Sequence, residues 1–359
     1  MLPLLLALGG AGAAAAALPT SLPDGANHLE IMMIYGMGPY NLGQQTLGKQ
    51  GGIKGQRPWA THLPYGLFAD QVEAYKTYKV PSFYGDMSSP FTNPVGASKI
   101  FLRGDQCKPA SYPVCHLGPE WETALEMLVH RDIQPGLANG TLSGVFLGDE
   151  LCCEDMPTRT GMECWESVIA PVADKLRAML GSKALIYTNE CGGEPMFNST
   201  MIKNGWKIPA SLDFISTDLY AGWLPPGTKC PDADKCPWDC SDHAPCCNTS
   251  GLCPQHSTDP AVTEIAAQKA FYEKQLIPAM HPHQKILTVP GTFGCHDVDA
   301  DGRKSPMTNA SSAKNVLAKL DAWMKYALSE PRIIGINPWC VIGDSRSLPR
   351  CHGCVLHTD

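Results

Sequence analysis

The feature of the sequence that most constrains its fold is a set of eight short apolar runs separated by longer segments. Each run is continuous and of strand length, which is typical of parallel strands covered on both faces. The runs lie at residues 30–36, 80–86, 99–105, 144–150, 184–190, 213–220, 285–292 and 333–340. Apolar residues at helical spacing lie between many of them, at residues 68–78, 120–131, 167–180, 262–280 and 311–330. This alternation predicts an α/β protein, and a count of eight strands favours a (β/α)8 TIM barrel.

A doubly wound open sheet is the alternative architecture for the same alternation. Its dinucleotide-binding version would place a G-x-G-x-x-G segment after the first strand, and the sequence has none there. No internal repeat or linker divides the chain. We therefore expect a single barrel domain over residues 28–345, with its functional side chains at the carboxyl ends of the strands.

The amino-terminal segment and the cysteines indicate the secretory pathway. Residues 1–17 form an apolar stretch followed by small residues, with Ala15 and Ala17 placed as in a signal-peptide cleavage site. The chain has 16 cysteines, which is rare in cytosolic proteins outside metal sites. Four N-x-[ST] glycosylation sequons begin at Asn139, Asn198, Asn248 and Asn309. These features predict a secreted, extracellular glycoprotein with no membrane segment after removal of the signal peptide.

Six of the cysteines lie in residues 230–253, within a loop insertion that we expect over residues 225–258. Their spacing lacks the paired C-x2-C ligands of zinc sites, so a loop held by disulfides is the favoured interpretation. Residues 346–359 are expected to form a tail tied down by cysteines. Cys152 and Cys153 cannot easily bridge to each other, because they are adjacent. Each should bridge to a different segment, such as those that carry Cys115, Cys164 or Cys191.

The charge of the chain limits its partners. A formal net charge of -7 and the lack of a Lys/Arg run argue against nucleic acid or an anionic membrane, and leave a carbohydrate open. The oligomeric state is not indicated. Asp297, Asp299 and Asp301 form the first half of a calcium loop, but its twelfth position is Thr308 instead of a bidentate glutamate. An acidic surface turn is therefore favoured over a calcium site, and we predict no metal and no cofactor.

Carboxylates and aromatic residues dominate the ends of the predicted strands. The candidate catalytic carboxylates are Asp149 and Glu150 on the fourth strand, Glu190 on the fifth and Asp218 on the sixth. The candidate substrate-binding residues are Tyr35, Tyr187, Asn189, Tyr220, Trp223, His296, Asn337 and Trp339. Paired carboxylates supply the proton donor and the charge stabiliser of glycosidic cleavage, and aromatic faces stack on sugar rings. The pattern predicts a glycoside hydrolase that acts on an oligo- or polysaccharide.

The GDE sequence at residues 148–150 resembles the H-x-G-G-D-E motif of β-N-acetylhexosaminidases, and Glu150 is similar in place to the strand-four glutamate of chitinase-like barrels. In those families the glutamate protonates the leaving oxygen, and an aspartate just before it orients the acetamido group of the substrate. The resemblance implies that Glu150 is the acid and Asp149 the orienting aspartate. It also matches Tyr220 and Trp339 to the tyrosine and tryptophan of strands six and eight.

Other interpretations of the same residues stay open. In a two-carboxylate mechanism, Glu190 or Asp218 would be the partner of Glu150, because the seventh run ends in TVPGTFG without the glutamate of many retaining barrel glycosidases. Asp149 is also placed where helix-capping aspartates occur. The alternative function is a secreted carbohydrate-binding barrel that lacks catalysis.

Overall fold

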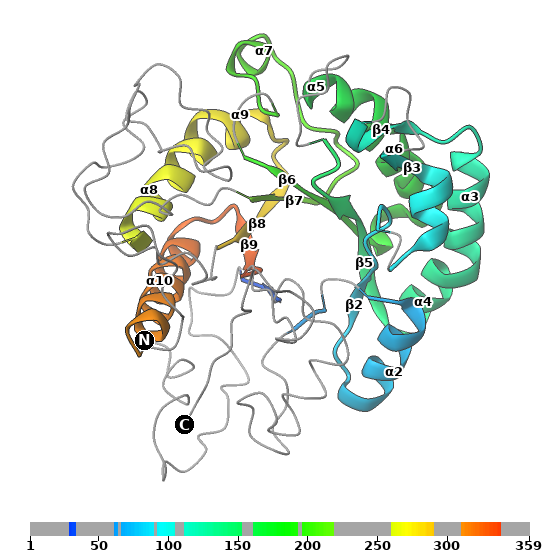
Figure 1. Ribbon diagram of the computed structural model, residues 1–359, viewed down its shortest axis with the longest axis horizontal. Helices are drawn as coiled ribbons and strands as arrows, with labels where there is room; N and C mark the ends of the chain where they lie inside the picture. Colours follow the sequence, from blue (N-terminus) through cyan, green and yellow to red (C-terminus); the bar gives the residue numbers. More distant parts are fainter. Residues whose placement is uncertain are drawn as a thin grey trace.

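The fold was obtained as a computed structural model, which describes residues 29–33, 61–63, 66–89, 92–104, 111–152, 161–192, 196–218, 260–290 and 310–338. Its centre is a curled, parallel sheet of seven strands in the order β1-β9-β8-β7-β6-β5-β2. The strands are β1 (Ile31–Met32), β2 (Ser82–Tyr84), β5 (Leu142–Asp149), β6 (Leu185–Cys191), β7 (Phe214–Asp218), β8 (Lys285–Val289) and β9 (Ile333–Ile336). Figure 1 shows these strands in the middle of the molecule with helices around their outer side.

Residues 61–63 connect the two edge strands of this sheet. On one side, Thr61 N donates a hydrogen bond to Met32 O of β1 at 2.9 Å. On the other side, Leu63 forms a parallel bridge with Ser82 of β2, and Phe83 N donates to Leu63 O at 3.0 Å. The main-chain hydrogen bonds therefore continue around a ring. Counted with this short segment, the ring has the eight parallel members of a TIM-barrel-like fold.

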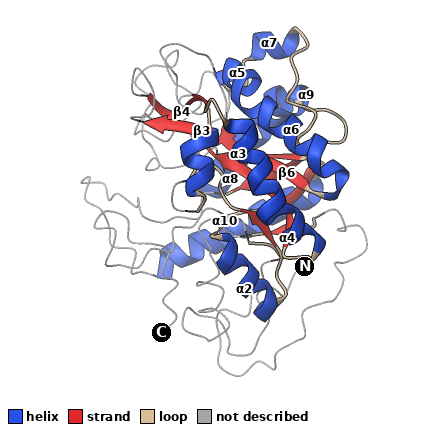
Figure 2. Cartoon of the chain, turned by 90° about the vertical axis from the view of Figure 1, so that its right-hand side faces the viewer, coloured by secondary structure: helices blue, strands red, loops and turns tan. Residues whose placement is uncertain are grey.

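The prediction that residues 99–105 form the third strand of the barrel is wrong. Its residues form β3 (Phe101–Gly104), which pairs with β4 (Ser111–Leu117) in a separate antiparallel hairpin. Figure 2 shows this hairpin projecting beyond the main sheet. A buried apolar run has the same composition in either place, because pairing partners are not encoded in the run itself. β5 keeps the fourth place in the ring, since residues 61–63 take the second.

The helices cover the outer face of the ring (Figure 1). They are α2 (Phe68–Tyr78), α3 (Trp121–Leu128), α4 (Gln134–Ala138), α5 (Gly161–Cys164), α6 (Ala170–Leu180), α7 (Ser199–Lys203), α8 (Pro260–Phe271), α9 (Ile277–Ala279) and α10 (Ala310–Ser329). All five helical stretches expected from the sequence are helical.

Three of these helices follow wide π-helical turns with a common cause. The turns are Val129–Ile133, Trp165–Ile169 and Tyr272–Leu276, and they lead into α4, α6 and α9. Each of the three helices has a proline in its first two residues: Pro135, Pro171 and Pro278. A proline has no N–H to complete the hydrogen bond to the residue four places before it, so the preceding turn widens.

The apolar core has a part inside the ring, a larger part between the ring and the helices, and a small third cluster of Leu63, Ala74 and Val80. The inner part includes Phe83, Phe146, Tyr187 and Phe214, which form one aromatic cluster. The Tyr187 ring is stacked between Phe146 and Phe214, with centroid distances of 4.6 and 4.5 Å. This cluster fills the ring below the carboxyl ends of the strands, so any site must lie above it.

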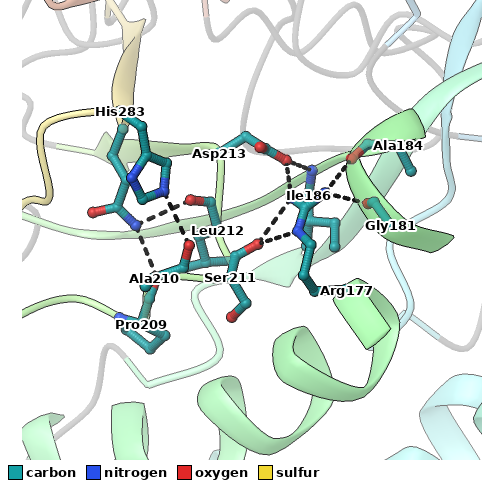
Figure 3. Close-up of polar contacts among 11 residues, drawn as sticks. Arg177, Gly181, Ala184, Ile186, Pro209, Ala210, Ser211, Leu212, Asp213 and His283 are labelled. Atoms are coloured by element: carbon teal, nitrogen blue, oxygen red, sulfur yellow. Dashed lines mark hydrogen bonds and ion pairs between the residues drawn. The ribbon is translucent and has the colours of Figure 1, made fainter. Parts of the chain in front are cut away.

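A polar network joins the amino-terminal ends of β6, β7 and β8 (Figure 3). Arg177 of α6 pairs with Asp213 and donates to Ser211 O at 3.0 Å. Asp213 in turn accepts a hydrogen bond from Ile186 N at 2.7 Å. His283 bonds to Ala210 O at 3.0 Å in the same region. These contacts fix the starts of three neighbouring strands at the end of the ring opposite to the candidate site.

Several predictions from the sequence fall outside the described residues. These are the signal peptide at 1–17, the insertion at 225–258 and the tail at 346–359. Among the helices that the structure describes, none is both long and apolar enough to cross a membrane.

Candidate active site

The candidate site begins at a β-bulge near the end of β5. Phe146 pairs with Tyr187 of β6, and Asp149 pairs with Asn189. Between these two pairs, β5 therefore has one residue more than β6. Strict alternation from Phe146 would turn Asp149 away from the inside of the ring, and the extra residue reverses this. Asp149 therefore shares a face with Asn189, whose Nδ2 donates to Asp149 Oδ1 at 2.8 Å.

Asn189 continues this polar layer toward β7. Its Oδ1 accepts a hydrogen bond from Ser216 Oγ. Asn189 and Ser216 are both buried, and each lies two residues beyond a ring of the aromatic cluster, Tyr187 and Phe214. Asn189 thus lies beside Asp149, and its role in substrate binding stays a prediction. The arrangement orients one carboxylate oxygen of Asp149 above an apolar floor.

Glu150 lies where β5 stops and the chain turns. Its φ angle is 50°, in the left-handed region that side chains other than glycine rarely adopt. Its N–H donates to Asn189 O at 2.8 Å, so the turn is tied to β6. Its Oε1 lies 3.7 Å from Cys191 Sγ, which has no hydrogen to donate because Cys191 is disulfide-bonded. The turn lets Glu150 stay half-buried at the same edge as Asp149 instead of alternating to the other face.

A disulfide holds the segment after Glu150. Cys152 bridges to Cys164 of α5, with 5.8 Å between their Cα atoms. This confirms the prediction that Cys152 is bridged to another segment, and Cys191 at the end of β6 is disulfide-bonded as well. Cys153 lies outside the described residues.

Glu190, a candidate catalytic residue from the sequence, lies on the other face of β6. It follows Asn189, so alternation directs it away from the aromatic cluster, and it is fully buried. Glu190 Oε2 accepts from Cys152 N at 3.0 Å, and its Oε1 lies 2.9 Å from Thr188 Oγ1. Burial, with the charges of Asp149 and Glu150, raises the pKa of Glu190 to about 8. This geometry does not suit a group that must contact substrate.

Two further candidates lie at strand ends. Asn337, just after β9, is buried, and its Oδ1 has no hydrogen-bond partner among the described residues. Its N–H donates to Thr288 O at 2.8 Å. Asp218 is the last residue of β7, where it pairs in register with Cys191 and Val289.

Other predicted residues are either packed in the core or outside the described part. Tyr187 is only 1% exposed with rings on both faces, so it has no free face for a sugar ring, contrary to the expectation from the sequence. The remaining candidates outside the described residues are Tyr35, Tyr220, Trp223, His296 and Trp339, together with the acidic turn at 297–302. In the described part of the chain, no group of three or more His, Cys, Asp or Glu side chains is placed to hold a metal ion.

His62 is a residue of the ring that the sequence did not indicate. Its ring lies 5.5 Å from the ring of Phe83 in the inner cluster, and its Nδ1 is 2.9 Å from Thr61 Oγ1. Burial lowers the pKa of His62 to about 4, so the imidazole is neutral at physiological pH. The sequence did not indicate His62, because the three-residue segment that contains it and closes the ring is too short to show a strand pattern.

Comparisons with known proteins give no family. No protein-family model matches the sequence, and no curated protein matches it. Among solved structures, the intracellular xylanase TsXylA of Thermoanaerobacterium saccharolyticum gives a TM-score of 0.47 at 8% identity, over 89% of each chain. A GH53 catalytic domain of Ignisphaera aggregans gives 0.41 at 12% identity, over 89% of this chain and 86% of the other. A β-glucuronidase of Ruminococcus gnavus gives 0.39 at 12% identity, over 78% of this chain and 37% of the other. These values are too low to carry an argument about function, so the proposal below depends on the site.

Proposed function

We propose that the chain is a secreted glycoside hydrolase that cleaves a glycosidic bond in an oligo- or polysaccharide at the carboxyl end of the ring. Glu150 is the general acid, and Asp149 is its neighbouring modulator. The observation that carries the proposal is the pairing of a bulge before Asp149 with a left-handed turn at Glu150. Together they bring two consecutive carboxylates to one strand end, where a regular strand would separate them.

The chemistry of glycosidic cleavage needs such a pair. One carboxyl group protonates the leaving oxygen, and a second carboxylate stabilises positive charge, activates water or attacks the sugar. Asp149 is oriented by Asn189, whose Nδ2 donates a hydrogen bond to its Oδ1 at 2.8 Å. Backbone strain of the kind seen at Glu150 is concentrated at functional sites.

The second carboxylate of the mechanism is Asp149 or Asp218. Glu190 is the weaker candidate, because its two oxygens already bond to Cys152 N and Thr188 Oγ1 on the outer face of β6. If Asp149 orients an acetamido group, the reaction is substrate-assisted. If Asp218 is the nucleophile or base, the reaction follows the two-carboxylate scheme. Proton NMR of the freshly released sugar separates inversion from retention, and requirement for an N-acetyl group identifies the substrate-assisted route.

The test is replacement of Glu150 by Gln, which keeps the shape of the side chain and removes its acid. Turnover of natural glycans found in a polysaccharide screen should fall by roughly 10²–10⁴-fold. Aryl glycosides whose leaving groups need no proton should lose much less. Glu73→Gln on the exposed side of α2 is the matched control and should leave both rates unchanged. If Glu150→Gln hydrolyses the natural glycan at the rate of the unmodified protein, Glu150 is not the general acid.

A carbohydrate-binding barrel without catalysis is the second candidate. The observation in its favour is that the run after β8, residues 290–294, has no carboxylate. Binding of a glycan by the unmodified protein, with no product after prolonged incubation, would favour this function.

A further inference from the structure

The residue that connects Glu190 to the β5 bulge near the candidate site is Thr188. Its hydroxyl is buried and has two acceptors in reach: Glu190 Oε1 at 2.9 Å and Gly148 O at 3.2 Å. A threonine hydroxyl has one hydrogen and can donate to only one of them at a time. Gly148 O belongs to the bulge of β5, directly before Asp149. Thr188 thus lies between a titratable group and the backbone that carries the candidate carboxylates.

The two protonation states of Glu190 require different hydrogen-bond arrangements. When Glu190 is ionised, its Oε1 can only accept, so the Thr188 hydrogen is drawn to it and Gly148 O loses this donor. When Glu190 is protonated, its O–H can donate to Thr188 Oγ1, and the Thr188 hydrogen is then free to bond Gly148 O. Cys152 N keeps its acceptor in both states, because the other oxygen of Glu190 accepts throughout.

We propose that Glu190 is a positioning residue whose protonation, relayed through the Thr188 hydroxyl, determines whether Gly148 O in the β5 bulge accepts the hydrogen bond of Thr188. The protonated form fixes Gly148 O and with it the backbone of Asp149 and Glu150. Its catalytic meaning depends on the function proposed above, but the relay itself does not.

The surroundings of Glu190 support the relay at accessible pH. Burial is the main cause that brings the pKa of Glu190 to about 8. Among the residues that the structure describes, the charged groups that act on it are Asp149 and Glu150 from the end of β5, and both disfavour its ionisation. Thr217, its neighbour in register on β7, is neutral, and Cys152 and Cys191 are disulfide-bonded and do not titrate. The transition should therefore fall within a range where the protein can be studied.

The Asp149 amide nitrogen reports the relay directly, because it shares a peptide group with Gly148 O. We would follow its ¹⁵N chemical shift from pH 6 to 10 in full-length, disulfide-intact protein labelled with ¹⁵N-aspartate. The unmodified protein and Thr188→Ser, which keeps the hydroxyl, should show an inflection near pH 8. Glu190→Gln, which imitates the protonated acid, and Thr188→Val, which lacks the hydroxyl, should show none.

Two results would overturn the proposal. One is an unmodified protein with no inflection in this range, and the other is an unchanged inflection in Thr188→Val. The glycosidase proposal is judged separately, by hydrolysis of an activated aryl glycoside. Its kcat/KM should fall above pH 8 in the unmodified protein and stay level in Glu190→Gln. If no variant hydrolyses any glycoside, the function is wrong while the NMR result still decides the relay.

Discussion

Single residues at the end of β5 show how narrowly the candidate site is determined. Position 148 favours glycine, because a Cβ there would collide with Ser88 and Leu151. Ser88 is itself held by Asp86, whose Oδ1 accepts from Ser88 N at 2.9 Å. The bulge that orients Asp149 therefore depends on the segment after β2, which is far away in the sequence.

The sequence could place Asp149 and Glu150 at a strand end, because the apolar run stops there. It could not separate them from Asn189 and Glu190, which end the next run in a similar way. The difference depends on the bulge in β5 and on the regular alternation in β6. Both are properties of strand pairing, so no single run contains them.

Glu190 should make the stability of the folded protein depend on pH. Because the pKa of Glu190 rises from 4.5 to about 8 on folding, the folded protein holds this proton more tightly than the unfolded chain. The stabilisation that Glu190 contributes is therefore fully present below pH 4.5 and is lost as pH rises to about 8. Over this range, the equilibrium constant for unfolding should rise by up to roughly tenfold per pH unit. Denaturant melts of Glu190→Gln should lack this slope.

The control for that measurement is Glu73→Gln, which should keep the pH dependence of the unmodified protein, since Glu73 is exposed. If the free energy of unfolding depends on pH in the same way for the unmodified protein and Glu190→Gln between pH 5 and 8, Glu190 is not buried in its protonated state.

Among the elements, the three-residue segment 61–63 has the largest effect for its length. It supplies the hydrogen bonds between β1 and β2, and its Leu63 is fully buried against Ala74 and Val80. The sequence predicted the other barrel strands from their continuous apolar runs and the main helices from the spacing of their apolar residues. It missed this segment and used residues 99–105 to complete the count, because a run of apolar residues does not specify its partner.

The prediction for this element is a matched pair of substitutions. Leu63→Ala should reduce the free energy of unfolding by about 2–5 kcal/mol, because it opens a cavity where the ring closes. Leu67→Ala, at a position 47% exposed, should change it by less than about 0.5 kcal/mol. Urea denaturation of both variants checks this. Similar stability of the two variants would mean that residues 61–63 do not close the ring.

The first and last strands that the structure describes, β1 and β9, are neighbours in the ring. Ile31 of β1 pairs with Gly335 of β9, so the ring cannot form without both of these strands. The α/β class and the parallel strands agree with the sequence interpretation, since they follow from a regular alternation. The insertion, the tail and the secretory features stay predictions.

This closure predicts cooperative unfolding. Far-UV circular dichroism and tryptophan fluorescence should give coincident urea transitions in the disulfide-intact protein, because the buried Trp165, in the turn before α6, and the buried Trp323, in α10, belong to separate helices around one ring. Gly335→Ala should lower both midpoints together, since a Cβ there would meet Ile31 O. A shift of one transition alone would indicate two independently folding parts.

The polar network around Arg177 and Asp213 also bears on how such a protein can change over evolution. It fixes β6, β7 and β8 at their starts, from an end of the ring that contributes nothing to the candidate site. Loops at the opposite end can then be exchanged without disturbing the alignment of these strands. Arg177 and its partners can thus stay constant, and with them the starts of three strands, while the segments at the carboxyl ends of the strands change in sequence.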